Sequence, residues 1–171
     1  MEEIKGLYYI PNAIDKNVIS LLDKQPWHNI QSTKGRKVQQ YGYIYNYKNS
    51  SVKEKTDDIP EFLYDYVKTL NCYINQLNLE PLVFNQCIIN NYEIGQCISK
   101  HIDSPKFGPI IGCYTLGCSG IMRFSKDGVH HDIKVEPNSL YIMSGDARYR
   151  WTHEMLKNKE GRRISITFRN V

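Results

Sequence analysis

The sequence predicts a mainly β protein of the α+β class, a double-stranded β-helix (jelly roll) backed by two N-terminal helices. Two observations lead to this fold class. From Pro81 onward, about eight short segments are apolar or alternating and are separated by turn residues, as in sandwiches and barrels with Greek-key connections. Before Pro81, two longer segments repeat their apolar residues at helical spacing.

The length of the chain sets the number of domains that we expect. A chain of 171 residues suits one domain with one core and is short for two. We therefore expect a single domain over residues 1–171, with the helices and a tyrosine-rich strand in residues 1–80 and the jelly-roll core in residues 81–171.

Each of the two helices is predicted from an apolar stripe of the kind that packs on a sheet. The first is predicted over residues of about 13–24, with Asn12 and Asp15 as capping candidates and Pro26 beyond its end. The second is predicted to begin at Pro60, a residue favoured in a first helical turn. Its stripe consists of Phe62, Leu63, Tyr66, Val67, Leu70, Tyr73, Ile74 and Leu77.

The segment between the helices predicts a strand followed by a loop. Over residues 37–47 apolar and polar residues alternate, and every second residue from Tyr41 to Tyr47 is a tyrosine. This pattern indicates a strand with one tyrosine-rich face. Residues 48–58 are polar and charged, which predicts a loop.

The jelly-roll core is predicted to contain eight strands between turn residues such as Gly95, Gly117 and Asp127-Gly128. These strands are expected over residues 82–93, 97–103, 109–117, 120–125, 129–136, 139–145, 148–155 and 162–170.

Composition narrows the classes of partner and compartment. The formal net charge of +4 permits an anionic partner such as nucleic acid but does not require one. Five cysteines without a CxxC pair argue against a disulfide framework and against a structural zinc site. There is no leader-like N-terminus and no apolar run near the ~20 residues that cross a membrane. We expect a monomer in the cytoplasm or nucleus, without a membrane partner.

Three residues of the C-terminal half form a candidate metal site. His101 and Asp103 are two apart in a predicted strand, so their side chains leave the same face. Alone, this pair also suits a solvated strand face. His153, about fifty residues later on another strand, supplies a third ligand and completes the two-histidine, one-carboxylate triad of non-haem Fe(II) oxygenases. Zinc accepts the same ligands and stays an alternative at this point.

Two arginines favour iron over zinc. Arg163 and Arg169 are six apart in the last predicted strand, which puts both on one face. A guanidinium holds a carboxylate through two hydrogen bonds, so the pair suits a dicarboxylate co-substrate that a hydrolytic zinc enzyme does not need. A structural salt bridge is the alternative explanation.

Four motifs in a fixed order resemble the AlkB family of Fe(II)- and 2-oxoglutarate-dependent dioxygenases, over residues of about 85–171. They are the Asn-x-Tyr of Asn90 and Tyr92, the His-x-Asp of His101 and Asp103, the turn Gly145-Asp146-Ala147-Arg148 before His153, and the Arg-x5-Arg of Arg163 and Arg169.

The resemblance implies roles for these residues. Fe(II) would be bound by His101, Asp103 and His153. 2-Oxoglutarate would be bound at its distal carboxylate by Arg163 with Asn90 and Tyr92, and Arg169 would lie near the end that chelates iron. Ser165 stands where some family members have asparagine. With O2 as the third reactant, 2-oxoglutarate would give succinate and carbon dioxide while a C–H bond of the substrate is oxidised.

The substrate expected from the resemblance is a modified nucleobase, which must leave a duplex or come from a single strand. Residues 42–45 resemble the nucleotide-recognition lid of the family, and Tyr43 is expected to face the substrate. Lys34 and Arg36 are expected to meet phosphates, and Arg148 is placed with them as a substrate residue. The alternative is that the tyrosines are packing residues and that the basic residues lie in a solvated turn.

Two details favour RNA over DNA. The repair prototype has a second acidic residue two positions after its metal aspartate, and Pro105 stands there in this chain. The sequence of residues 148–153 resembles most the branch of the family that hydroxylates the wobble uridine of tRNA. We expect oxidative demethylation or hydroxylation of a base in RNA, tRNA in particular, ahead of single-stranded DNA. A protein hydroxylase or demethylase and a non-catalytic jelly-roll binding module are the alternatives.

Overall fold

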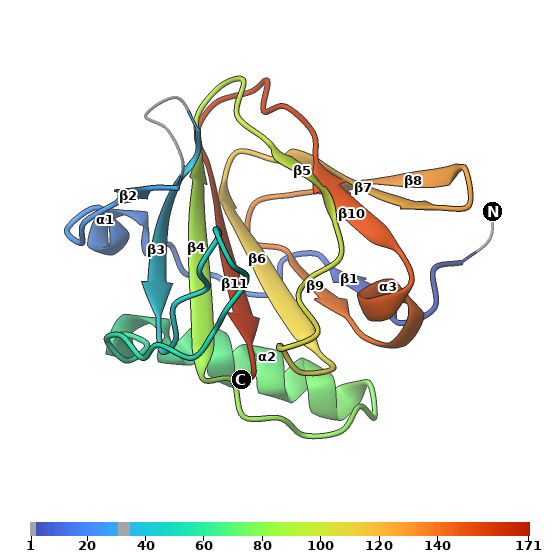
Figure 1. Cartoon of the computed structure of the whole chain (residues 1–171), viewed down its shortest axis with the longest axis horizontal. Helices are drawn as coiled ribbons and strands as arrows, with labels where there is room; N and C mark the ends of the chain where they lie inside the picture. The colour runs from blue at the N-terminus through green and yellow to red at the C-terminus, as the bar shows by residue number, and fades with distance from the viewer. Residues whose placement is uncertain (1–2, 31–34) are drawn as a thin grey trace.

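Two antiparallel sheets face each other in the computed structural model, which describes residues 3–30 and 35–171 (Figure 1). Over these residues the large sheet has the order β1 (Leu7–Ile10), β9 (Leu140–Met143), β6 (Ile111–Gly117), β11 (Arg163–Arg169), β4 (Gln86–Tyr92), β3 (Lys37–Tyr41) and β2 (His28–Asn29). The small sheet has the order β5 (Ile98–His101), β10 (Thr152–Met155), β7 (Gly120–Lys126) and β8 (Val129–Val135). The predicted mainly β jelly-roll class is confirmed.

The central strands of the large sheet are buried because both of their faces are covered. Every residue of β4 is buried, and so are the first six of β11. One core cluster lies between the large sheet and a helix, and a second lies between the two sheets. A strand that is covered on both faces needs apolar residues at nearly every position. Polar side chains that point between the sheets therefore require a specific explanation.

The second predicted helix is confirmed. Glu61–Leu63 form a 3-10 turn and α2 follows over Tyr64–Gln76, directly after Pro60. Tyr66, Leu70 and Ile74, four residues apart, are its buried positions. Leu70 reaches the backbone of β6 because Gly112 has no side chain: a Cβ there would lie 2.6 Å from Leu70 Cδ1.

The first predicted helix, over residues 13–24, is wrong in length. Only α1 (Ile19–Leu22) is helical, and its first amide bonds the side chain of Asn17 at 2.9 Å, so neither Asn12 nor Asp15 is its cap. The amides of residues 13 and 14 instead bond the carbonyl of Asn138, at 2.8 and 3.4 Å. The contact with this distant turn outweighs a weak local helical preference.

The tyrosine-rich strand is shorter than predicted. β3 ends at Tyr41, because Gly42 has a φ of +80° and a side chain there would overlap the Asn85 carbonyl. The chain then leaves the sheet and doubles back, with Ile44 N bonding the Glu54 carbonyl at 2.9 Å. We call residues 42–57 the lid hairpin; it lies in front of β3 and β4 in Figure 1. The loop predicted over residues 48–58 is mostly its returning arm.

All eight strands predicted for the core occur, with two adjustments. The strand predicted over residues 148–155 is β10 only from Thr152, because α3 (Gly145–Tyr149) precedes it. β1, which pairs with β9, was not predicted as a strand. In the described part of the chain, no helix has the length and apolar character needed to span a membrane.

Candidate metal centre and co-substrate cavity

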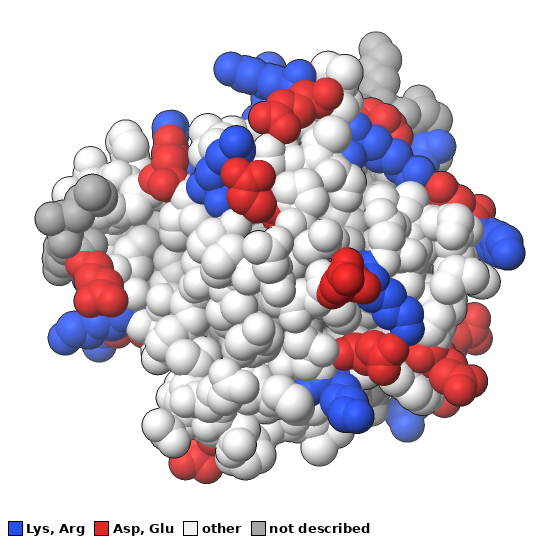
Figure 2. Space-filling view, turned by 180° about the vertical axis from the view of Figure 1, so that it is seen from behind, with Lys and Arg blue, Asp and Glu red and all other residues white. Residues whose placement is uncertain are grey.

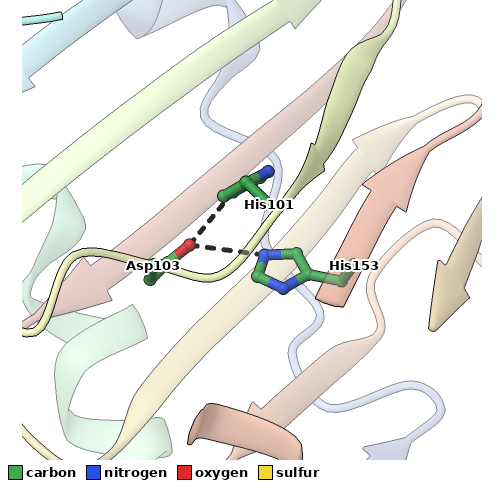
Figure 3. Close-up of side chains that lie close together, drawn as sticks. All are labelled: His101, Asp103 and His153. Atoms are coloured by element: carbon green, nitrogen blue, oxygen red, sulfur yellow. Dashed lines mark hydrogen bonds and ion pairs between the residues drawn. The ribbon is translucent and has the colours of Figure 1, made fainter. Parts of the chain in front are cut away.

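The three candidate metal ligands meet between the two sheets. His101 ends β5, Asp103 lies in the loop that follows, and His153 lies on β10 directly opposite His101. Their ligand atoms all lie within 4.8 Å of one another. Asp103 Oδ1 is 3.1 Å from His101 Nε2 and 3.3 Å from His153 Nε2, and Figure 3 shows these contacts meeting at one carboxylate oxygen. The sequence prediction of a cluster is confirmed.

The His101 ring is held in a form that suits a metal ion. Its Nδ1 lies 2.7 Å from the Ser99 carbonyl, which can only accept, so Nδ1 carries the proton. In the neutral ring, Nε2 then presents a lone pair to the carboxylate of Asp103. Two acceptors at 3.1 Å attract each other only with a proton or a cation between them. A divalent metal ion therefore fits these donor atoms.

Asp103 and His153 have the charge states that metal binding needs. Burial alone would raise the pKa of Asp103, but the positive charge of Arg169 beside it holds that pKa well below its usual range. Burial lowers the pKa of His153, which favours the neutral imidazole. The cluster therefore offers a carboxylate and two imidazoles as ligands.

A cavity beside the cluster, here called the inner cavity, has the polar residues that were predicted to bind a co-substrate. From the large sheet it is lined by Asn90, Tyr92, Arg163, Ser165, Thr167 and Arg169, and His101, Asp103 and His153 line its other side. Arg163 and Arg169 share one face of β11, as their spacing predicts. Asn90 Nδ2 lies 3.4 Å from Ser165 Oγ across the β4–β11 pair.

The two arginines differ in their partners. Arg169 places Nε and Nη2 each 2.7 Å from Asp103 Oδ2, so the salt-bridge alternative holds for this residue. Arg163 has no acidic partner among the described residues: Nη2 donates to Thr115 Oγ1 at 2.8 Å, and the guanidinium lies 5.4 Å from the Tyr92 ring centre. Arg163 Nε and Arg169 Nη1 are buried without a hydrogen-bond acceptor. A buried carboxylate ligand would satisfy both.

A second, more open cavity adjoins the first on the side of the lid hairpin. This outer cavity has a volume of about 400 Å³ and is lined by Arg36, Tyr45, Tyr47, Lys100 and Phe107. Five residues, Asn90, Ile98, His101, Asp103 and Arg169, line both cavities. The metal cluster thus stands between a buried cationic cavity and an aromatic cavity that opens to solvent.

Comparison with known proteins identifies the family. The family model of the 2OG-Fe(II) oxygenase superfamily matches residues 10–169. The chain belongs to this superfamily. Within it, the Arabidopsis thaliana protein named "Alkylated DNA repair protein ALKBH8 homolog" is 27% identical over 98% of this chain and 59% of its own length. The Xenopus tropicalis "tRNA (carboxymethyluridine(34)-5-O)-methyltransferase alkbh8" is 34% identical over 75% of this chain and 21% of its own length.

Further comparisons agree with an AlkB-like oxygenase. Protein L905 of Acanthamoeba polyphaga mimivirus is 37% identical over 74% of this chain and 68% of its own length. The solved structure of OsALKBH1 superposes with a TM-score of 0.75, covering 99% of this chain and all of that one at 14% identity, which shows the shared fold. The AlkB-like resemblance is therefore confirmed. This chain spans 59% of the length of the Arabidopsis relative and 21% of the length of the Xenopus relative.

The structure places Tyr43, expected from the resemblance to face a substrate, outside the lining of the outer cavity. Tyr43 forms an isolated bridge with Lys55, whose Nζ lies 5.7 Å from the Tyr43 ring centre. Tyr45 and Tyr47 line the cavity instead. The strand predicted over residues 37–47 ends at Tyr41, so its alternation does not extend to these tyrosines.

The basic residues proposed for substrate binding have different positions. Arg36 lines the outer cavity, but its Nε donates to Asn90 Oδ1 at 2.9 Å and its guanidinium lies 6.0 Å from the Tyr47 ring centre. It thus links the co-substrate side to the lid hairpin. Lys34 lies outside the described residues.

Arg148 is not placed to contact a substrate. It is 1% exposed, and its guanidinium donates to four backbone carbonyls of the loop after Asp103. The sequence gives no sign of this burial, because arginine side chains are rarely buried in full.

Some residues of the site had no sequence signal. Phe107 packs against Tyr45, with ring centres 5.8 Å apart, and against the Arg169 guanidinium at 4.9 Å. Thr115 bonds Arg163. Neither residue belongs to a motif. Thr115 lies in a predicted strand, and only the pairing of that strand with the Arg163 strand could have placed it at the site.

Proposed function

We propose that this protein is an Fe(II)- and 2-oxoglutarate-dependent dioxygenase that demethylates or hydroxylates a modified nucleobase, in RNA, particularly tRNA, ahead of DNA. The observation that carries the proposal is the wall shared by the two cavities. His101 and Asp103 border both the buried cationic cavity and the open aromatic one. Co-substrate and substrate would therefore reach one metal ion from two sides.

The inner cavity supports Fe(II) and 2-oxoglutarate as the bound pair. His101 Nε2, Asp103 and His153 Nε2 would hold the iron, and Arg163 would hold the distal carboxylate of 2-oxoglutarate with Asn90, Tyr92 and Ser165. With 2-oxoglutarate and O2, bound iron supplies an oxidant for C–H bonds and releases succinate and carbon dioxide. Arg169 keeps the Asp103 carboxylate in place through its second oxygen.

The outer cavity supports a flat, anionic substrate. Its volume of about 400 Å³ lies within the usual range for small-ligand pockets. Tyr45, Tyr47 and Phe107 provide ring faces on which a base can stack. Lys100 is exposed at the cavity, and Lys106 is exposed in the loop beside it. On the opposite side of the molecule, basic and acidic side chains lie next to one another (Figure 2), which offers no continuous basic surface there.

The names of relatives favour nucleic acid as the substrate class. The Xenopus relative is named for tRNA, and a Caenorhabditis elegans relative, 28% identical over 99% of this chain, is named "DNA N6-methyl adenine demethylase". We propose RNA first because the tRNA-named relatives include those of Macaca fascicularis and Mus musculus as well. We further propose one monomeric domain in the cytoplasm or nucleus, a reducing setting that suits five free cysteines.

A mass-spectrometric survey of nucleosides tests the proposal. Iron-loaded protein, 2-oxoglutarate and air are incubated separately with total tRNA, other RNA and single-stranded DNA, and nucleosides and succinate are measured. We expect loss of one modified nucleoside, matched by succinate, only with the wild-type protein and not with Asp103→Ala. Equal activity of Asp103→Ala would refute the proposed site. A product found only on added methylated peptides would favour a protein substrate, and iron uptake without succinate a binding module.

A further inference from the structure

Arg148 connects the two chain segments that bring Asp103 and His153 together. It lies in the last turn of the short helix α3, five residues before His153. Its Nη1 donates to the carbonyl of Asp103 at 3.0 Å, and Nη2 donates to the carbonyls of Ser104 and Phe107 at 2.8 and 3.2 Å. The Nε atom donates to the Gly108 carbonyl at 3.2 Å. One side chain therefore bonds both ends of the loop that carries a metal ligand.

The residues that Arg148 holds, 103–108, form neither strand nor helix, and we call them the ligand loop. Only a few other bonds fix it: Phe107 N bonds the Ser104 carbonyl at 3.1 Å and Gly108 N bonds the Asn170 carbonyl at 2.9 Å. Without Arg148, four carbonyls of the loop would lose a charged donor. Backbone carbonyls left unpaired in a buried place favour rearrangement of the chain.

The side chains of the ligand loop point to the site itself. Arg169 bonds the Asp103 carboxylate and lies 4.9 Å from the ring centre of Phe107, and Phe107 packs against Tyr45 of the lid hairpin. The position of this loop therefore sets the position of a metal ligand and of one wall of the outer cavity.

We propose that Arg148 is a positioning residue that fixes the Asp103 backbone relative to the His153 segment before a metal ion binds. The inference rests on the proposed metal site and adds a residue that touches neither metal nor substrate. A guanidinium is required because its five N–H groups fan out in one plane and reach four carbonyls, whereas an ammonium group has three donors.

Metal affinity of variants tests this role without any turnover. Mn²⁺ binding is measured by electron paramagnetic resonance on wild type, Arg148→Met, Arg148→Lys and Arg150→Met, together with thermal unfolding of each. Arg150 lies in the same segment, but its side chain is 69% exposed and pairs with Asp146, so it controls for loss of a nearby charge. We expect Arg148→Met to weaken Mn²⁺ binding about 10- to 100-fold, the usual range for residues that orient metal ligands. Arg148→Lys should lie between it and wild type, and Arg150→Met should match wild type.

Hydrogen exchange of the wild-type protein gives a test that needs no variant to fold. If the ligand loop is set in advance, the amides of Phe107 and Gly108 should be protected in the metal-free protein as well as in the Mn²⁺-loaded one. Protection that arises only with Mn²⁺ would overturn the proposal. So would folded Arg148→Met protein with wild-type affinity. A wild-type protein that binds no Mn²⁺ would instead refute the proposed metal site, which keeps the two failures apart.

Discussion

The inner cavity and the lid hairpin differ in how their side chains are held. The cavity residues lie on β4 and β11, central strands with a partner on each side, and Arg163 is 1% exposed. The lid tyrosines lie outside the sheets and are half-buried. Tyr45 is fixed mainly by the side chain of Gln40, which bonds its amide at 2.6 Å and its carbonyl at 3.2 Å. In the proposed function, the rigid region would bind the constant co-substrate and the region with fewer constraints would meet the substrate.

The largest effect is expected at the metal cluster, which both regions share. Asp103→Ala removes a ligand and leaves the buried guanidinium of Arg169 without its partner. We expect succinate formation to fall by more than about 100-fold, beyond the loss usual for residues that only orient ligands. Unfolding should also become easier, by roughly 3–5 kcal/mol. Succinate assays and chemical denaturation measure both, and retention of activity in this variant contradicts the shared-site interpretation.

The next largest effect is expected at the inner cavity, on co-substrate binding alone. Arg163→Met should raise the KM for 2-oxoglutarate about 10- to 100-fold, because charged hydrogen bonds contribute about 1.5–3 kcal/mol each. Mn²⁺ binding without co-substrate should be no weaker than in wild type. Arg162→Met is the matched control: the adjacent arginine pairs with Asp23 on the surface, and its loss should leave this KM unchanged. An equal rise in this KM for both variants would mean that the loss of any arginine in this segment, and not the loss of the inner-cavity contact, causes the effect.

Within the lid hairpin, two tyrosines should differ. Tyr45→Leu removes a ring that lines the outer cavity, and we expect nucleic-acid KM to rise by roughly 5- to 100-fold, since stacking of one base contributes about 1–3 kcal/mol. Succinate formation without nucleic acid should stay the same. Tyr43→Leu should change neither quantity, because Tyr43 lies against Lys55. Steady-state assays with and without RNA compare the pair, and a larger effect of Tyr43→Leu would support the expectation, based on the family resemblance, that Tyr43 faces the substrate.

The smallest effect is expected at the rim of the outer cavity. Lys100 is exposed there. If it contacts one phosphate of a single strand, the slope of log K for binding against log salt concentration becomes steeper by about 0.7. Lys100→Ala should flatten that dependence by this amount while co-substrate KM is unchanged. Lys24→Ala, an exposed lysine at the end of α1, serves as the control. Titrations of RNA binding at several salt concentrations show whether Lys100 contacts a phosphate.

The sequence predicted best those parts of the site that depend on strand periodicity. Arg163 and Arg169 share a face because side chains in a strand alternate, whereas Asn90 and Tyr92 were expected from the resemblance to the AlkB family. The lid hairpin escaped prediction because the strand expected over residues 37–47 ends at Tyr41, before Gly42 with its positive φ. Arg148 escaped because the direction of a side chain in a turn depends on tertiary contacts with a loop forty residues away.

The first predicted helix failed for a related reason. Residues 13–14 bond the Asn138 carbonyl, and no local pattern reports a contact between parts of the chain so far apart. The long stripe of α2, by contrast, needs only a sheet to cover, and its position was predicted from Pro60 and the apolar repeat. Elements defined by their own periodicity were therefore predictable, and elements defined by distant partners were not.

Under the proposed function, the unpaired nitrogens of Arg163 and Arg169 would link the stability of the protein to the concentration of its co-substrate. A buried N–H group without an acceptor lowers the stability of the folded chain, and a ligand that binds only the folded state raises that stability by mass action. At a concentration one hundred times its Kd, such a ligand adds about 2.7 kcal/mol to the free energy of unfolding. The amount of intact protein in a cell would then follow the supply of the dicarboxylate, independently of any turnover.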